Sequence, residues 1–286
     1  MKSSEIITPE GNIAQYTIDN NNHGLNFIFS HANGFNGRVY NSLLHKINNH
    51  YNIHTYDMRG HGDTTLKANP NNLKSWYSFR DDLLSVIENF KTPVVLSGHS
   101  MGATASLLVA LYKPELVKKL ILIEPVILPL RYIISYRLLQ FLKLAHFVSP
   151  LARNASIRRN GWDTKEQAIE YFKGKKLFSK TNDEVITNYV EYGLKKVSQY
   201  KLKCNPSWES ACFRLTSHEV WFDLKYINIP VKIILTPGSL VCNNSSQSRI
   251  KKYIPHSEIC FIDQSSHMLP LEKIDEVSAE INNFLE

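Results

Sequence analysis

The pentapeptide Gly98-His99-Ser100-Met101-Gly102 fits the pattern Gly-x-Ser-x-Gly, which presents a serine hydroxyl between two glycines. A β-branched apolar run precedes it at residues 93–97, and small and aliphatic residues follow it at 103–111. This context predicts a strand that turns sharply into a helix at Ser100. The glycines allow close backbone approach at such a turn, and the helix N-terminus favours developing negative charge. We therefore predict that Ser100 is a nucleophile.

A serine hydroxyl is a weak nucleophile near pH 7 and needs a general base beside it. His267 lies in a loop between a predicted last strand at 258–262 and a predicted final helix at 273–284. That loop belongs at the same edge of the sheet as Ser100. His256 precedes the last strand and so belongs at the opposite edge. We predict that His267 is the base.

Acyl transfer also needs N–H donors for the oxyanion of its intermediate. The residue after the nucleophile normally supplies one, which predicts the backbone N–H of Met101. The second donor is expected from the polar, glycine-rich loop at 30–37, with the sequence Ser-His-Ala-Asn-Gly-Phe-Asn-Gly. An ordinary turn would use the same residue types, so composition alone leaves that alternative open.

The elements that must position these residues alternate between strands and helices, which predicts a mostly parallel, doubly wound α/β sheet with helices on both faces. A hairpin at 6–8 and 14–18 is expected to add an antiparallel edge and bring the sheet to about eight strands. The other predicted strands lie at 25–29, 52–56, 93–96, 119–123, 231–235 and 258–262, with helices at 39–47, 76–90, 103–111 and 273–284.

The alternation stops between about residues 126 and 229, where the pattern is helical at 130–147, 164–171 and 183–197. An interval of this length is an element of its own rather than a loop. We predict that residues 128–228 form a helical cap, inserted after the sixth strand above the carboxyl ends of the strands. The core then consists of residues 1–127 and 229–286.

Four motifs, in chain order, resemble those of the α/β-hydrolase fold family, which includes bacterial esterases, proline iminopeptidase-like enzymes and carbon–carbon bond hydrolases. They are His-Ala-Asn-Gly at 31–34 where the family usually has His-Gly-x-Pro, Asp-Met-Arg-Gly-His-Gly at 57–62, the elbow at 98–102, and Ser-His-Met-Leu-Pro-Leu-Glu at 266–272. The resemblance covers everything except the predicted cap, and it implies the α/β-hydrolase fold. Aligning the first motif makes Asn33 the second oxyanion donor, or Phe35 if the loop is shifted.

Other polar residues inside these motifs need not touch substrate. In the family they more often brace neighbouring loops, and we expect the same structural role here. These residues are His31, Arg59, His61 and His99.

This chain departs from the family at the catalytic acid. The family usually carries it as an Asp in a Gly-x-x-Asp turn just after the seventh strand. Here residues 234–244 read Ile-Leu-Thr-Pro-Gly-Ser-Leu-Val-Cys-Asn-Asn and contain no carboxylate. Without an acid, the base would lose the group that fixes its tautomer, so another carboxylate must be sought at this edge.

Glu124 ends the predicted sixth strand, directly before a proline, and is the acid that we predict. Some α/β-hydrolases, those of the pancreatic-lipase type among them, carry their acid at this strand end, and the nucleophile–acid–base order is kept. Relatives whose acid lies elsewhere also have an acidic residue here. Asp263, close to the base in sequence, and Asp223, at the end of the predicted cap, are the alternatives.

A serine nucleophile predicts a serine hydrolase of the carboxylesterase type, and argues against the epoxide hydrolases and haloalkane dehalogenases, whose relatives carry an Asp there. Thioester or carbon–carbon bond hydrolysis would use the same three residues. A non-catalytic receptor relative is the alternative of another class. We expect no cofactor and no metal, because the four cysteines are widely spaced and no dinucleotide-binding loop is present.

The net charge of +7 comes from scattered Lys and Arg residues without a nucleic-acid-binding motif, so we expect no nucleic-acid partner. No run of about 18 apolar residues and no signal-peptide pattern occurs, which predicts a cytoplasmic protein.

The segment 129–147 is apolar with cations at intervals, which suits a small-molecule substrate with an apolar or aromatic acyl group. It also suits contact with a membrane surface, but we favour packing of this helix on its neighbours.

Overall fold

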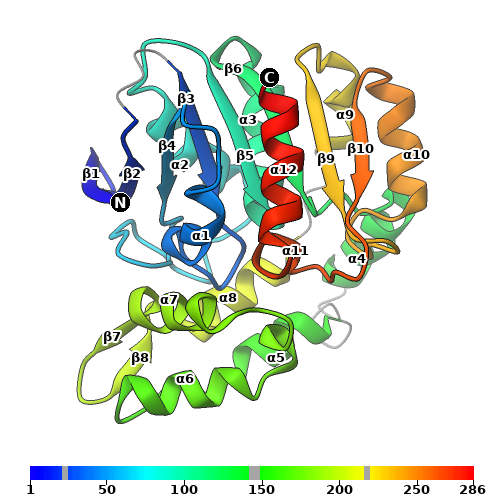
Figure 1. Cartoon of the computed structure of the whole chain (residues 1–286). Helices are drawn as coiled ribbons and strands as arrows, with labels where there is room; N and C mark the ends of the chain where they lie inside the picture. The colour runs from blue at the N-terminus through cyan, green and yellow to red at the C-terminus, as the bar shows by residue number, and fades with distance from the viewer. Residues whose placement is uncertain (21–24, 142–148, 216–219) are drawn as a thin grey trace.

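A single eight-stranded sheet forms the centre of the molecule (Figure 1). The computed structural model describes residues 1–20, 25–141, 149–215 and 220–286. The strand order is β1-β2-β4-β3-β5-β6-β9-β10. In this order, β2 is antiparallel to both its neighbours, and the six strands that follow it in the sheet run parallel to one another. The predicted mostly parallel sheet of about eight strands is therefore confirmed. The strands are β1 (Lys2–Thr8), β2 (Gly11–Ile18), β3 (Asn26–Ser30), β4 (Asn52–Tyr56), β5 (Val94–His99), β6 (Val117–Ile123), β9 (Val231–Leu235) and β10 (Glu258–Phe261).

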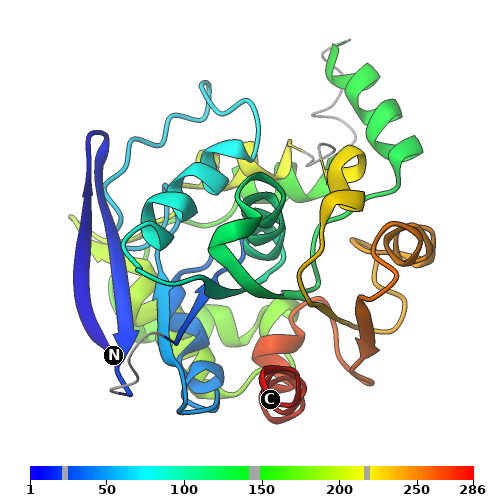
Figure 2. The same cartoon turned by 90° about the horizontal axis from the view of Figure 1, so that it is seen from above.

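Two central strands, β5 and β9, are buried along their whole length because helices cover both faces of the sheet. Every residue of β5 and of β9 is buried, as expected of parallel strands covered on both faces, whose sequences are mainly apolar. One apolar cluster packs α2 (Tyr77–Ile87), α3 (Met101–Tyr112) and α10 (Asn244–Tyr253) on one face. A second packs α1 (Asn41–Leu44) and α12 (Ile274–Leu285) on the other (Figure 2).

Two helical segments of the core differ from the prediction. The helix expected at 39–47 is a 3-10 turn, Gly37–Tyr40, followed by the single turn of α1. Helix α10 was not predicted, because its sequence Asn-Ser-Ser-Gln-Ser-Arg-Ile-Lys-Lys-Tyr buries only Ser246 and Ile250. One buried aliphatic residue makes no periodic pattern that sequence analysis could detect.

The elements between β6 and β9 lie mainly at the carboxyl ends of the strands (Figure 1). The helices are α4 (Leu130–Phe141), α5 (Pro150–Ser156), α6 (Lys165–Lys173), α7 (Asp183–Gly193), α8 (Pro206–Phe213) and α9 (Val220–Asp223). The helix predicted at 130–147 is described as far as Phe141, and residues 142–148 lie outside the described residues. The helix predicted to reach 197 instead ends at Gly193, and a short hairpin of β7 (Leu194–Lys196) and β8 (Tyr200–Leu202) follows. In the described part of the chain, no helix is both long and apolar enough to cross a membrane.

Candidate active site

Ser100 occupies the turn between β5 and α3 in a strained backbone conformation. Its φ of 56° and ψ of −117° lie outside the regions that a residue with a side chain prefers. Two backbone hydrogen bonds hold it there: its N–H donates to Ile123 O at 2.9 Å, and its carbonyl accepts from Thr104 N at 3.1 Å. The predicted strand–turn–helix geometry at Ser100 is therefore present.

The two glycines of the motif are required by packing. A Cβ at Gly98 would lie 2.6 Å from the carbonyl carbon of Gly102, and a Cβ at Gly102 would overlap the backbone carbonyl oxygens of Ser30 and His31. The elbow therefore packs directly against the end of β3, and backbone atoms cannot move aside as a flexible side chain could.

Gly102→Ala is expected to lower the free energy of unfolding by about 3 kcal/mol, because the added methyl group overpacks a rigid backbone contact. Urea denaturation followed by circular dichroism measures this. Gly174→Ala is the matched control: its Cβ would lie 3.6 Å from the nearest atom, the Tyr171 carbonyl oxygen. Equal stability of the two variants would contradict the packing argument.

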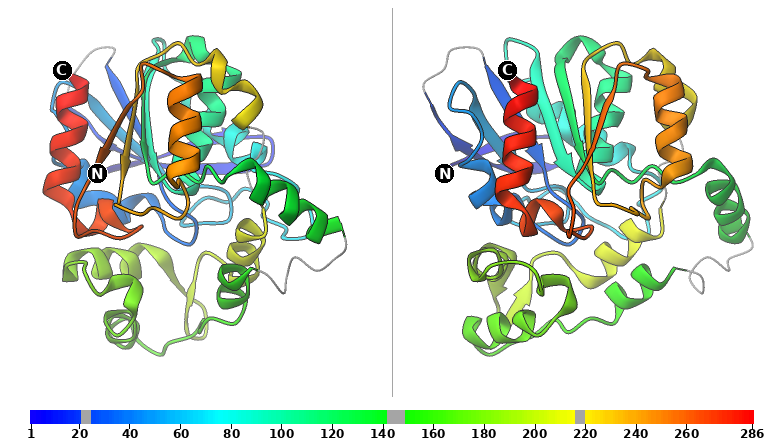
Figure 3. Two further views of the ribbon diagram at one scale, coloured as in Figure 1. Left: turned by 90° about the vertical axis from the view of Figure 1, so that its right-hand side faces the viewer. Right: turned by 45° about the vertical axis from the view of Figure 1, so that its right-hand side comes forward.

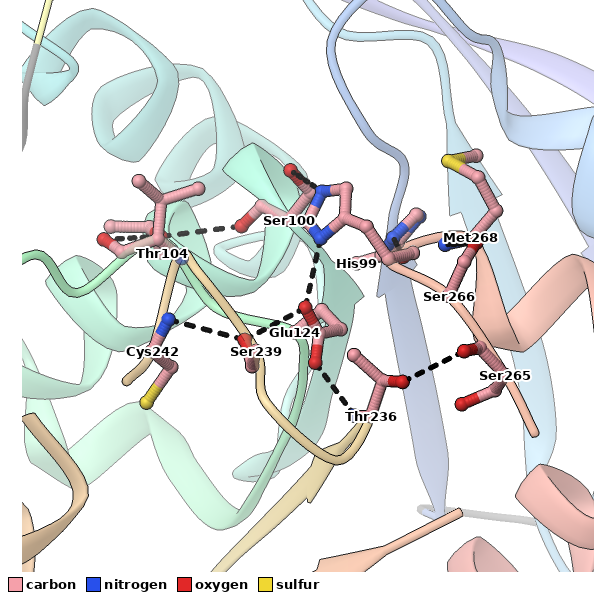
Figure 4. Close-up of polar contacts among 12 residues, drawn as sticks. His99, Ser100, Thr104, Glu124, Thr236, Ser239, Cys242, Ser265, Ser266 and Met268 are labelled. Carbon is pink, nitrogen blue, oxygen red and sulfur yellow. Dashed lines mark hydrogen bonds and ion pairs between the residues drawn. The ribbon is translucent and has the colours of Figure 1, made fainter. Parts of the chain in front are cut away.

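The structure brings the predicted nucleophile, base and acid into contact (Figure 4). His267 Nε2 lies 2.9 Å from Ser100 Oγ, and His267 Nδ1 lies 2.9 Å from Glu124 Oε2. An ionised carboxylate only accepts hydrogen bonds, so Nδ1 carries the proton and Nε2 is left to accept from the serine hydroxyl. The His267 side chain is 38% exposed and that of Glu124 is 1% exposed, so the carboxylate is shielded while the imidazole reaches solvent.

Glu124 follows β6 with a φ of 49°, and its buried carboxylate has three hydrogen-bonding partners. Besides the imidazole, Oε1 accepts from the Thr236 N–H at 2.8 Å and Oε2 accepts from the Ser239 hydroxyl at 3.0 Å. Burial of a carboxylate is costly unless such donors bond its oxygens. The alternative acids Asp263 and Asp223 are both exposed, and the described contacts of His267 include neither.

The loop that follows β3 is a candidate source of the second oxyanion donor. Its Ala32 N–H donates to the Tyr40 hydroxyl, and its Gly34 N–H donates to His61 Nε2. The Phe35 N–H donates to the Ala32 carbonyl at 3.2 Å, so the alternative donor is already engaged. The described contacts include no acceptor for the Asn33 N–H. Met101, the first residue of α3, has an N–H without an intrahelical acceptor.

A buried chain of side chains links this loop to the backbone of the base. The Tyr40 hydroxyl lies 2.7 Å from His99 Nδ1, and His99 Nε2 lies 2.7 Å from the carbonyl oxygen of His267. Burial lowers the pKa of His99 well below its usual value, so the ring is neutral. It donates from Nε2 and accepts from the tyrosine at Nδ1. Tyr40 could not be recognised from the sequence, since none of its sequence neighbours marks it as part of the site.

Two residues of the 266–272 motif hydrogen-bond to each other and hold the loop that carries His267. Glu272 accepts from the Ser266 N–H at 2.7 Å and from the Ser266 hydroxyl at 2.6 Å. The Thr236 hydroxyl donates to the Ser265 carbonyl at 3.0 Å, which ties the loop to the turn after β9. The turn that holds Glu124 therefore also holds the loop of the base.

His31 and His61 support the loops of the site as neutral, buried acceptors. His31 Nε2 accepts from the Met58 N–H at 2.9 Å, and His61 Nε2 accepts from the Gly34 N–H at 3.0 Å. Burial lowers the pKa of His31 to about 4 and that of His61 to about 3. Arg59 forms a pair of hydrogen bonds with the Asp82 carboxylate at 2.7 and 3.0 Å. The expected structural roles fit these contacts.

These histidines predict a loss of stability in mild acid. The unfolded chain binds a proton at each histidine near pH 6.5, whereas the folded chain does so only near pH 4 or below. Stability is therefore full above pH 6.5 and decreases as the pH falls toward 4, on the order of 2 kcal/mol for each histidine between pH 7 and pH 5. Urea unfolding at the two pH values measures it. His61→Asn should shrink the difference, and identical stabilities of the unmodified protein at pH 7 and pH 5 would contradict the argument.

Helix α8 rests on the same loop after β3. Asn33 Nδ2 donates to the Glu209 carbonyl at 3.1 Å, and a Cβ at Gly34 would lie 2.7 Å from Glu209 Oε1. The Glu209 carboxylate pairs with Arg158 at 2.6 Å, and Arg158 also donates to the Tyr189 hydroxyl at 2.9 Å. A partly buried ion pair in the inserted segment therefore meets the candidate oxyanion loop. The sequence carried no signal for it.

Comparison with known proteins agrees with this architecture. A model of the Alpha/beta hydrolase family matches residues 27–280, so the chain belongs to that family. The sequence is similar to AB hydrolase superfamily protein YfhM of Bacillus subtilis (strain 168), with 25% identity over 230 residues that cover 78% of this chain and 76% of that protein.

Two solved structures are similar over nearly their whole length. One is the thioesterase domain from the curacin biosynthetic pathway, with a TM-score of 0.78, 15% identity and 98% of each chain covered. The other is E-2-(acetamidomethylene)succinate hydrolase, with a TM-score of 0.78, 16% identity and coverage of 99% of this chain and 98% of that one. These names denote different activities on one fold, so the fold does not decide the substrate. The predicted family and fold are confirmed.

Proposed function

We propose that this chain is a serine hydrolase that cleaves a carboxylic ester through an acyl-enzyme on Ser100. The observation that carries the proposal is the contact chain from Ser100 Oγ through His267 to Glu124, with 2.9 Å at each step. His267 takes the serine proton as Oγ attacks the carbonyl carbon, and then delivers it to the departing alkoxide. A water molecule, activated by the same imidazole, hydrolyses the acyl-enzyme. Glu124 keeps the imidazole in the required tautomer and stabilises the imidazolium.

The backbone N–H groups of Met101 and Asn33 serve as the oxyanion hole in this proposal. Both belong to segments that meet at the elbow, since Gly102 packs against the backbone of Ser30 and His31. Fixed N–H donors stabilise the charge that develops on the carbonyl oxygen. Residues 128–228 form the cap over this site, and residues 1–127 with 229–286 form the core. The substrate is a small molecule with an apolar or aromatic acyl group.

Labelling by a fluorophosphonate probe tests the nucleophile. The unmodified protein is expected to form a covalent adduct at Ser100, and Ser100→Ala is expected to form none. Ser179→Ala, at an exposed serine outside the site, is the matched control and keeps the label. Absence of labelling in the unmodified protein would overturn the hydrolase proposal and favour a receptor.

The same three residues would also cleave a thioester or a carbon–carbon bond. A panel of ester, thioester and amide substrates of graded acyl length distinguishes these reactions. The proposal expects the highest kcat/KM with an ester, and a higher value for a thioester would replace it.

A further inference from the structure

The turn after β9 keeps the family's acid position, but a serine occupies it. Leu235 ends β9, and Thr236-Pro237-Gly238-Ser239 follows; when Thr236, directly after the strand, is aligned with the glycine of the family's Gly-x-x-Asp turn, Ser239 aligns with the acid. Ser239 thus stands where the acid usually stands. The side chain is buried, and its hydroxyl lies 3.0 Å from Glu124 Oε2.

We propose that Ser239 is a positioning residue that replaces the family's acid and orients Glu124 toward the base; this inference rests on the proposed function. The direction of its hydrogen bond follows from its other contact. Ser239 Oγ accepts from the Cys242 N–H at 3.2 Å, so its one proton is free to be donated to Glu124 Oε2. That oxygen is also the one that faces His267 Nδ1, at 2.9 Å.

The Glu124 carboxylate needs these hydrogen bonds because of the backbone position of the residue. It lies at the end of β6, outside the usual acid position, and reaches the imidazole across the turn after β9. The Thr236 N–H holds one carboxylate oxygen and the Ser239 hydroxyl holds the other. Donors at both oxygens favour the orientation in which Oε2 faces His267 Nδ1; Figure 4 shows Glu124 between Ser239 and Thr236. Each donor also stabilises the ionised form.

Ser239→Ala tests the positioning role. We expect kcat for an aryl ester to fall roughly ten-fold with little change in KM, because the lost hydrogen bond acts on the acid and not on substrate binding. Because the carboxylate that contacts the base loses one of its donors, the pH profile of kcat should also change. Ser239→Thr, which keeps the hydroxyl, should restore part of the rate. Leu240→Ala, at the exposed neighbouring residue, is the matched control.

A relocation experiment tests whether position 239 is equivalent to the family's acid position. An aspartate there would carry its carboxylate oxygens about 1.2 Å beyond the present hydroxyl position, toward the space that the Glu124 carboxylate now fills. In the Glu124→Ala background, adding Ser239→Asp is expected to raise kcat at least roughly ten-fold. Adding Leu240→Asp to the same background should not. Circular dichroism confirms that each variant is folded.

The outcomes separate this inference from the proposed function. If Ser100 is labelled and the unmodified protein turns over esters, but Ser239→Ala has unchanged kcat and pH profile, the positioning role is refuted and the hydrolase proposal stands. If the unmodified protein neither labels nor turns over, the proposed function itself fails. A lower kcat in Ser239→Ala together with recovery in the relocated variant supports the inference.

A second, independent observation concerns the exposed face of α4. Ile134, Leu138 and Phe141 are 60%, 59% and 84% exposed, and their i, i+4, i+7 spacing places them on one stripe of the helix. The exposed Arg131 and Arg137 flank this stripe. Ile133 and Tyr136, on the other side, are buried, so the expected packing of this helix on its neighbours holds for one face only.

We propose that this apolar stripe binds an anionic lipid surface. The positive charge around the stripe favours an anionic surface. The described residues 125–141 and 149–162 contain no carboxylate, and their exposed cations include Arg131, Arg137 and Arg153. A helix with apolar side chains between arginines is typical of segments that lie in a membrane interface. Helix α4 lies at the periphery of the molecule (Figure 3), and it begins six residues after Glu124.

Cosedimentation with vesicles tests this proposal. The protein is expected to bind vesicles of phosphatidylcholine with phosphatidylglycerol, to bind pure phosphatidylcholine weakly, and to dissociate as salt increases. Ile134→Ser with Phe141→Ser should lower binding roughly ten-fold or more. Ile7→Ser is the matched control, because Ile7 is a single apolar residue, 84% exposed, on β1. Absence of binding, equal binding by the stripe variant, or a dimer that this variant dissociates in sedimentation velocity would each overturn it.

Discussion

Replacement of Ser100 by alanine is expected to lower kcat for a short aryl ester by roughly 10⁶-fold, with little change in KM. In the proposed mechanism the Ser100 hydroxyl forms the acyl bond, so no acyl-enzyme can form without it. The predicted N–H donors at Met101 and Asn33 are untouched by the substitution, so a small residual rate above that in water should remain. Steady-state assays on protein purified separately from the unmodified enzyme measure the change.

Ser179→Ala again provides the comparison, since it removes an exposed hydroxyl far along the chain from the elbow. Its kcat should equal that of the unmodified protein. Retention of more than a tenth of the turnover by Ser100→Ala would show that another group performs the attack. Thermal unfolding of Ser100→Ala should show a folded protein, because alanine removes one polar atom and adds none.

Glu124→Gln is expected to lower kcat by roughly 10³- to 10⁴-fold. The reason lies in the hydrogen-bond donors around the carboxylate. Thr236 donates to Oε1, and Ser239 and His267 donate to Oε2. Whichever position the amide NH₂ group takes, it meets a donor. The amide therefore disfavours the tautomer with a proton on Nδ1, and Nε2 loses its ability to accept the serine proton. The pH profile and kcat of the purified variant measure this effect.

Asp263→Asn separates the two candidate acids. Asp263 is exposed, so its substitution should leave kcat close to that of the unmodified protein. The reverse result, with near-normal turnover in Glu124→Gln and a large loss in Asp263→Asn, would assign the acid to the histidine loop. Near-normal turnover in both variants would point to a hydrolase without an essential acid.

Most of the core could be predicted from sequence because its signals are local. A run such as Val-Lys-Ile-Ile-Leu at β9 can be recognised as a buried strand without knowledge of its neighbours. The turn at Ser100 could be predicted for the same reason, since its glycines and flanking elements are adjacent in the chain. Helix α10 and the β7–β8 hairpin were missed, because short or polar elements carry little periodicity and depend on the surface on which they pack.

The candidate acid shows the limit of local reasoning more clearly. The sequence predicts Glu124 as the acid only from its position, as a carboxylate at the end of a strand at the correct edge of the sheet. Nothing in the sequence indicated that Thr236 and Ser239 would donate to it, because they lie 112 and 115 residues away. Tyr40 and Glu209 were missed for the same reason, since their partners are distant in sequence.

By itself, the sequence determined the family, the order of the strands along the chain and the residue types that meet at the carboxyl edge of the sheet. These follow from hydrophobic periodicity and short motifs, which act between neighbours in the chain. Only the tertiary structure decided the distances between Ser100, His267 and Glu124, and which side chains support them. The physical reason is that hydrogen bonds require donor and acceptor to lie within about 3 Å, and packing of the whole sheet sets that spacing.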